Sequence, residues 1–138
     1  MTPPRTFKRF SLIVHGTRLR GMQLTETPFA GATPIDGYGP NFFRIGGVVV
    51  RGPVLLLPTY RLPWGGFDDV RSILERASEF DVLFVGTGAS TTPLPPAMRD
   101  PLTEGGVALE PMLTPAACRT YNVLLSEGRR VAAALLPV

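Results

Sequence analysis

The sequence of 138 residues contains one cysteine, one histidine and one lysine, and these scarcities exclude several kinds of site. Cys118 alone cannot form an intrachain disulfide, which is typical of proteins from a reducing compartment such as the cytoplasm. His15 and Cys118 do not supply the four ligands of a structural zinc site, so we expect no metal. No run reaches the ~20 apolar residues of a transmembrane helix, so any association with a membrane is expected to be peripheral.

Charge is also sparse, because charged residues make up 18% of the chain and the net charge is +3. The excess lies before residue 21, where no acid occurs, and beyond it the signs nearly balance. We therefore expect a modestly basic arm and no nucleic-acid-binding surface. The arm, Thr6–Gly21, is rich in arginine and poor in acids like a transit peptide. The strand-like composition of Phe10–Val14 instead favours an arm that enters the fold.

The apolar residues, 44% of the chain, are sufficient for one globular domain. A chain of this length buries roughly two thirds of the surface that its unfolded form exposes. We expect residues 1–8 to be a flexible end and residues 9–138 to form the domain. The 15 glycines and 15 prolines predict short elements with sharp ends.

The first half of the chain has the composition of strands and turns. A strand is predicted near Phe10–His15, followed by a long surface connection over Thr25–Pro40 that contains a cluster of turn residues at Ile35–Pro40. Phe42–Val50 and Val54–Leu57 are rich in β-branched and aromatic residues. The short connection between them, Arg51-Gly52-Pro53, predicts that they pair as a hairpin.

From residue 68 onward, helical and strand patterns alternate. Asp68 is expected to cap the first helix, with Val70, Ile73, Leu74 and Ala77 on its apolar face. Thr114 is expected to cap the last helix, which Gly128 ends. The predicted order is helix 68–80, strand 81–85, helix 95–104 (with Pro101 in its interior), strand 107–112, helix 114–127 and strand 131–137. This order predicts an α/β fold with largely parallel pairing, and the antiparallel hairpin that precedes it makes the central sheet, flanked by helices, a mixed one.

The stretch Asp81–Gly88 places a glycine loop, Gly86-Thr87-Gly88, directly after an apolar strand. Such a loop can hold an anion on its amides, and in open α/β sheets ligands gather at this end of a strand. The stretch is neither a dinucleotide-binding fingerprint nor a phosphate loop with its lysine, and no cofactor is expected. A tight structural turn is the favoured interpretation.

The helix that follows Thr114 supplies the other candidate residues. Arg119 and Asn122 are three positions apart and share a side of the helix, so they could line a ligand or partner surface with the glycine loop. The predicted site is therefore the junction of Gly86, Thr87 and Gly88 with Thr114, Arg119 and Asn122. Cys118 in the first turn could be a nucleophile, but a small buried residue is favoured. No catalytic residue is proposed.

Several longer motifs resemble one known family. They are Ile35-Asp36-Gly37-Tyr38-Gly39, Val85-Gly86-Thr87-Gly88, the stretch Glu110–Leu124 with its Ala116-Ala117-Cys118-Arg119-Thr120-Tyr121-Asn122 core, and Glu127–Leu135. They are similar to the family of unknown function that includes mitochondrial complex I assembly factor 3 and uncharacterised bacterial proteins. The resemblance covers about residues 10–137. It implies one α/β domain with a mixed sheet and an extra β-ribbon, and it brings no catalytic residues.

The resemblance leads to two competing functions. For mitochondrial members it implies an assembly role near the inner membrane, with other assembly factors as partners. The absence of an evident long targeting extension favours a bacterial, cytoplasmic member, at the inner face of the membrane. The leading hypothesis is a non-enzymatic protein that binds a respiratory-complex subunit or assembly factor. The alternative is a protein or enzyme that binds an anion or nucleotide-like molecule beside Gly86-Thr87-Gly88.

Overall fold

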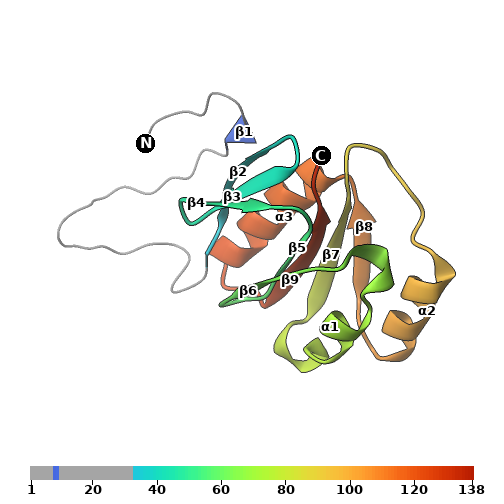
Figure 1. Cartoon of the computed structure of the whole chain (residues 1–138). Coiled ribbons are helices and arrows are strands. Elements are labelled where there is room, and N and C mark those ends of the chain that lie inside the picture. Colours follow the sequence, from blue (N-terminus) through green and yellow to red (C-terminus); the bar gives the residue numbers. More distant parts are fainter. Residues whose placement is uncertain (1–7, 10–32) are drawn as a thin grey trace.

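The fold is a pair of β-sheets with three helices (Figure 1), seen in a computed structural model that describes residues 8–9 and 33–138. Of the expected flexible end and basic arm only residues 8–9 are described, and the predicted strand Phe10–His15 and the first half of the connection Thr25–Pro40 lie outside the described residues. The smaller sheet is antiparallel, with strand order β1-β2-β3-β4. Its strands are β1 (Lys8–Arg9), β2 (Ile35–Gly39), β3 (Phe42–Ile45) and β4 (Val48–Arg51).

The larger sheet has the strand order β6-β5-β9-β7-β8 and is mixed, as the alternating pattern predicted. Strand β7 is parallel to both β8 and β9, whereas β5 is antiparallel to β9 and β6. The strands are β5 (Val54–Leu56), β6 (Arg61–Pro63), β7 (Val82–Thr87), β8 (Leu109–Met112) and β9 (Val131–Leu136). The helices are α1 (Arg71–Leu74), α2 (Pro96–Glu104) and α3 (Thr114–Ser126), with 3-10 turns at Gly66–Asp68 and Ala77–Glu79.

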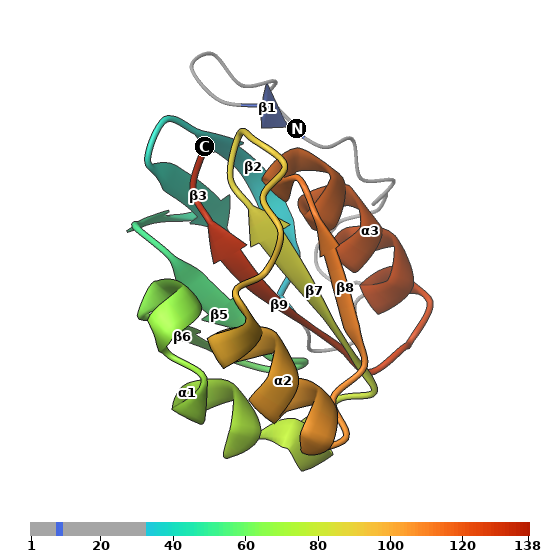
Figure 2. The same cartoon turned by 90° about the vertical axis from the view of Figure 1, so that its right-hand side faces the viewer.

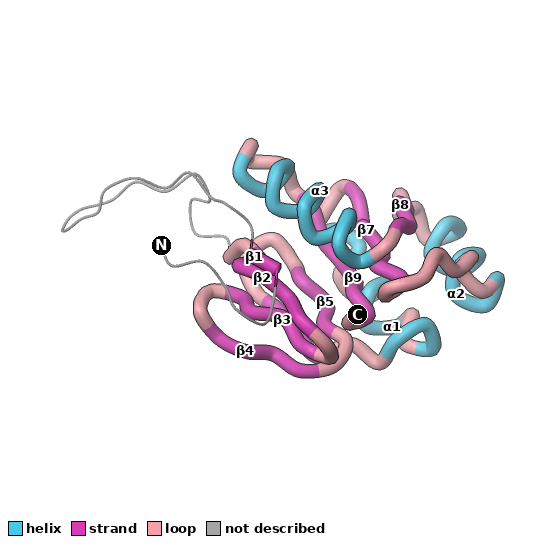
Figure 3. Tube along the Cα trace, turned by 90° about the horizontal axis from the view of Figure 1, so that it is seen from above, coloured by secondary structure: helices cyan, strands magenta, loops and turns pink. Residues whose placement is uncertain are grey.

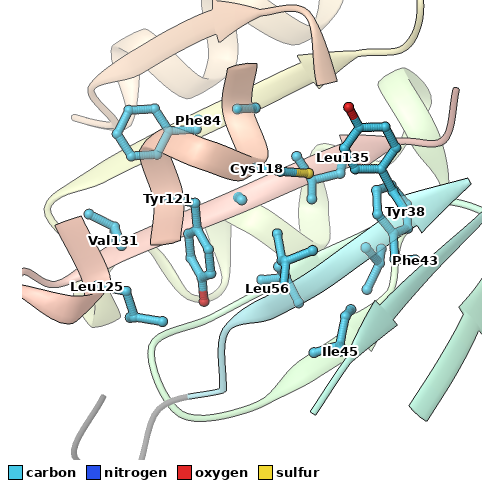
Figure 4. Close-up of a cluster of buried hydrophobic side chains, with 14 residues drawn as sticks. Tyr38, Phe43, Ile45, Leu56, Phe84, Cys118, Tyr121, Leu125, Val131 and Leu135 are labelled. Carbon is cyan, nitrogen blue, oxygen red and sulfur yellow. The ribbon is translucent and has the colours of Figure 1, made fainter. Parts of the chain in front are cut away.

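The two faces of the larger sheet are covered by different elements (Figures 2 and 3). On one face, α3 and the smaller sheet enclose a core that includes Tyr121, Leu125 and Phe43 (Figure 4). On the other face, α1 and α2 pack against the alternate residues of the same strands. Strand β9 is buried on both sides, which explains its uninterrupted apolar sequence. Each large side chain in these cores contributes roughly 1.5–3 kcal/mol through burial.

Helix α3 follows its prediction closely. Ala117, Tyr121 and Leu125 are buried on one face, and Leu124 packs beside them. Gly128 ends the helix with a φ of 82°, where glycine has no steric penalty. Helix α2 also forms as predicted, with Pro101 in its interior and Gly105 after its last residue.

The predicted hairpin was wrong in its position. The run Phe42–Val50 is not one strand, because it folds back at Gly46-Gly47 to make β3 and β4. Both glycines have positive φ, 57° and 82°, as a tight type I′ hairpin turn requires. Strand β5 then joins the other sheet, where it pairs with β6 and β9 rather than with β4.

The predicted turn cluster at Ile35–Pro40 was also wrong, since Ile35–Gly39 is strand β2. Turn-forming composition yields here to tertiary pairing with β3 and to burial of Ile35 and Tyr38. A register shift between Ile35 and Gly37 accommodates the glycine, as β-bulges commonly do.

The helix predicted over residues 68–80 is broken into α1 and two 3-10 turns. At the break, the Arg76 guanidinium donates to the Ser72 carbonyl, which the Arg76 amide would bond in a continuous α-helix. The Arg76 amide donates to the Ile73 carbonyl instead. Asp69, rather than Asp68, accepts the Ser72 amide at the start of α1. On the predicted apolar face, Ile73 is buried, but Leu74 is exposed.

Candidate functional site

The end of β7 and the start of α3 lie against each other, as the predicted junction requires. The Gly88 amide donates to Thr114 Oγ1 over 2.8 Å, and the Thr114 amide donates to the Gly88 carbonyl over 3.0 Å. Thr114 Oγ1 also donates to the Leu136 carbonyl over 2.6 Å. One buried hydroxyl thus joins β7, α3 and the end of β9. This use of the hydroxyl replaces its predicted role as a helix cap, and no side chain caps α3.

The strand runs further into the glycine motif than predicted, because Gly86 and Thr87 belong to β7 and Gly88 alone begins the turn. A Cβ at Gly86 would lie 2.7 Å from Thr114 Oγ1 and 2.9 Å from Leu135 Cδ2, so only glycine allows α3 to approach this closely. Gly88 has a φ of 89°, which also favours glycine. Both glycines therefore have a structural reason to be there.

The polar groups of this junction are used within the protein. Thr87 Oγ1 lies 2.9 Å from the Ser90 carbonyl, to which it donates. The amides of Gly88 and Thr114 and the hydroxyl of Thr114 are engaged as described above. An anion would need these donors free, since amides and hydroxyls bind it by donating hydrogen bonds. The geometry is that of a tight, internally bonded turn.

Asn122 lies farther along α3 and fixes the smaller sheet. Its Oδ1 accepts the Ile35 amide over 2.9 Å and its Nδ2 donates to the Ile35 carbonyl over 2.8 Å. The Asn122 residue is only 5% exposed. It lies eight positions after Thr114, about 12 Å along a helix. Arg119, in contrast, is exposed to solvent. Of the six predicted site residues, Gly86, Thr87, Gly88 and Thr114 form the junction. Asn122 forms a buried clamp, the pair of hydrogen bonds that joins α3 to β2. Arg119 lies on the surface.

Cys118 is fully buried in the core between α3 and the two sheets (Figure 4). Burial raises the pKa of its thiol to about 12, although the nearby charge of Arg119 acts in the opposite direction. The thiol is therefore protonated at neutral pH and is a poor nucleophile. The prediction of a small buried residue is confirmed.

The raised pKa of the Cys118 thiol predicts that the free energy of unfolding decreases in alkali. Its pKa of about 12 in the folded protein exceeds the ordinary value of 9.0, so the unfolded chain loses this proton first. The stabilisation is complete below about pH 9 and declines as the pH rises toward the folded value. Between about pH 8 and about pH 10, the free energy of urea unfolding should decrease by about 1 kcal/mol more in the natural protein than in Cys118→Ala. Equal decreases in the two proteins would contradict this account.

The signal that the sequence interpretation missed lies in β4. Val48 and Val49 are 50% and 43% exposed, and the sequence pattern had placed them in one continuous strand, Phe42–Val50. The adjacent Gly46-Gly47 pair could have indicated the turn that brings them to an edge.

Within residues 8–9 and 33–138, no cluster of three His, Cys, Asp or Glu side chains is suited to a metal ion. No helix in the same part of the chain has the length and apolar character needed to cross a membrane.

Comparison with known proteins gives matches over most of the chain. A family model for a protein of unknown function (DUF498/DUF598) matches residues 35–136. An uncharacterized protein from Rhodobacter capsulatus is 53% identical over 113 residues, which are 82% of this chain and 91% of that protein. NADH dehydrogenase (ubiquinone) 1 alpha subcomplex assembly factor 3 from Danio rerio is 36% identical over 129 residues, covering 87% and 73% respectively. The crystal structure of an outer membrane protein from Bartonella henselae has a TM-score of 0.70 at 37% identity, covering 78% of this chain and 97% of that one.

Proposed function

This chain belongs to the DUF498/DUF598 family of proteins of unknown function, and from that premise we propose that it is a non-enzymatic binding protein that assists the assembly of a membrane respiratory complex like complex I. The observation that carries the proposal is the 36% identity to an NADH dehydrogenase assembly factor across 87% of this chain. The partner would be a subunit of the complex or another assembly factor. This cytoplasmic protein would bind it at the inner face of the membrane.

Two potentially reactive side chains of α3 are buried in the core and are not available for catalysis. The thiol of Cys118 is buried and protonated, and Tyr121 is buried with its hydroxyl 3.4 Å from the Leu57 carbonyl. Burial also raises the pKa of the Tyr121 hydroxyl. These groups hold the core together, which leaves recognition to the surface of the protein.

The small-molecule alternative at Gly86-Thr87-Gly88 remains a separate prediction. It receives less support, because the donors of Gly88 and Thr114 that would bind an anion pair with each other and with Leu136. A bound anion would have to compete with hydrogen bonds that join three elements of the fold.

Affinity capture from native membranes tests the assembly role. The tagged full chain, expressed at its natural level, should enrich complex I subunits or their assembly proteins from mildly solubilised inner membranes. A strain that lacks the protein should contain less assembled complex I, which native gels with in-gel activity measure. A membrane-anchored protein unrelated to respiration, carrying the same tag, is the control. Capture of no respiratory or other membrane subunit, together with an unchanged level of complex I, would refute the proposal.

A further inference from the structure

The edge strands of the two sheets differ in how they are protected. Exposed edges in natural proteins usually carry proline or lysine, which discourage pairing with another chain. In the larger sheet, β6 ends with Pro63 and β8 contains Pro111. In the smaller sheet, β1 consists of Lys8–Arg9. Strand β4 has neither device in its three consecutive valines (Val48–Val50), and two of these are exposed.

The backbone of β4 directs part of its amide and carbonyl groups away from β3. Within the described part of the chain its one strand neighbour is β3, and it lies at the outer edge of the smaller sheet (Figure 3). Ile45 and Val48 flank the two-residue turn, so they form a hydrogen-bonded pair, and such pairs alternate along an antiparallel ladder. Val50 therefore also bonds toward β3. The amides and carbonyls of Val49 and Arg51 point away from β3, toward an incoming strand.

The side chains of β4 continue the apolar layer beyond the edge of the sheet. Val48 and Val50 lie opposite the buried Ile45 and Phe43 and share their face. Val50 packs against the core, whereas Val48 is half exposed. A further strand with apolar residues on this face would cover Val48 and extend the core by one row.

The outer face of the same hairpin is basic. Arg44 and Arg51 lie on it, and the Arg51 guanidinium stands 5.9 Å from the centre of the Phe42 ring. The carboxylate of Asp36 is also near the turn, where it accepts the Gly47 amide over 2.7 Å. A second copy of this chain, paired with β4 about a two-fold axis, would place the arginines of both copies on one face. Like charges brought together in this way oppose pairing, so charge favours a different occupant.

We propose that β4 is a docking edge for an extended segment of a protein partner in which apolar residues alternate with acidic residues. The apolar residues would cover Val48 beside the core, and the acidic residues would meet the exposed Arg51. This inference rests on the proposed binding function and specifies the surface that performs it.

Capped, fluorescently labelled peptides test the edge directly by anisotropy with the full chain. The peptide Thr-Val-Glu-Val-Glu-Val-Thr should bind at least ~10-fold more tightly than the same peptide with lysine in place of glutamate. Arg51→Glu should remove or invert this preference, and Val48→Lys should weaken binding of both peptides. Val123→Ser, an exposed change on α3, should leave binding unchanged. Thermal unfolding of each variant confirms that it is folded.

Equal binding of the two peptides, or an unchanged preference in Arg51→Glu, would overturn the inference. So would a dimer of the natural chain, seen by sedimentation, that Val48→Lys dissociates, because β4 would then be covered by a second copy. Membrane capture separates the two proposals. If Val48→Lys captures respiratory subunits as well as the natural chain does, the assembly role stands and the β4 edge is wrong. If the acidic peptide binds as expected but the natural chain captures no such subunit, the edge stands and the assembly role is wrong.

Discussion

Replacement of Asn122 by leucine is expected to lower the free energy of unfolding by about 2–5 kcal/mol. The leucine fills a similar volume but leaves the amide and carbonyl of Ile35 without partners in a fully buried position. Each buried unsatisfied group costs about 1–3 kcal/mol. Urea unfolding followed by circular dichroism measures the change.

The neighbouring change Val123→Ser is the matched control for Asn122→Leu. Val123 is 55% exposed on the same helix, and valine and serine have similar helix propensities. Its effect should stay within about 0.5 kcal/mol. If Asn122→Leu costs as little as this control, the clamp between α3 and β2 contributes nothing to stability.

The second large effect is expected at Thr114. Thr114→Val keeps the shape of the side chain but removes the hydroxyl that accepts from the Gly88 amide and donates to the Leu136 carbonyl. The loss of both partners should cost about 2–4 kcal/mol. Differential scanning calorimetry and urea unfolding should both detect it.

Thr120→Val makes the same chemical change in the same helix and serves as the control for Thr114. Thr120 is only partly buried, so removal of its hydroxyl should cost less than about 1 kcal/mol. Similar losses for the two variants would show that the hydroxyl of Thr114 does not hold the junction together.

The second half of the fold could be predicted because its signals are long and local. Strand β9 is apolar throughout, and α3 has a regular apolar face and ends at Gly128, so each is specified by adjacent residues. The family resemblance carried by the same region is confirmed by the matching family model. The order of helices and strands then required parallel pairing, which the structure contains.

The first half was harder to predict because its structure depends on distant partners. Strand β2 has the composition of a turn, yet it is held by β3 and by Asn122, which lies 87 positions away in the sequence. The hairpin was misplaced because the strand propensity of Val48–Val50 outweighed the turn signal of Gly46-Gly47. In the helix predicted over residues 68–80, the break depends on a side-chain contact of Arg76 that periodicity does not report.

The candidate site was predicted in its location more than in its detail. Gly86, Thr87, Gly88 and Thr114 do come together, because β7 and α3 meet at the carboxyl end of the sheet. The roles of Arg119 and Asn122 could not be separated by their spacing, since positions three apart share only part of a helix face. Burial of Asn122 follows from the position of β2, which the sequence pattern did not reveal.

The position of β9 has a consequence for how the protein is made. Residues 131–136 form the last element of the fold, yet they lie between β5 and β7 near the centre of the larger sheet. A nascent chain on the ribosome therefore carries β5 and β7 without the strand that joins them until synthesis of this segment is complete. Such non-local pairing slows folding and leaves strand edges open to aggregation meanwhile. We expect the larger sheet to form in one cooperative step, and only after residues 131–136 have been made.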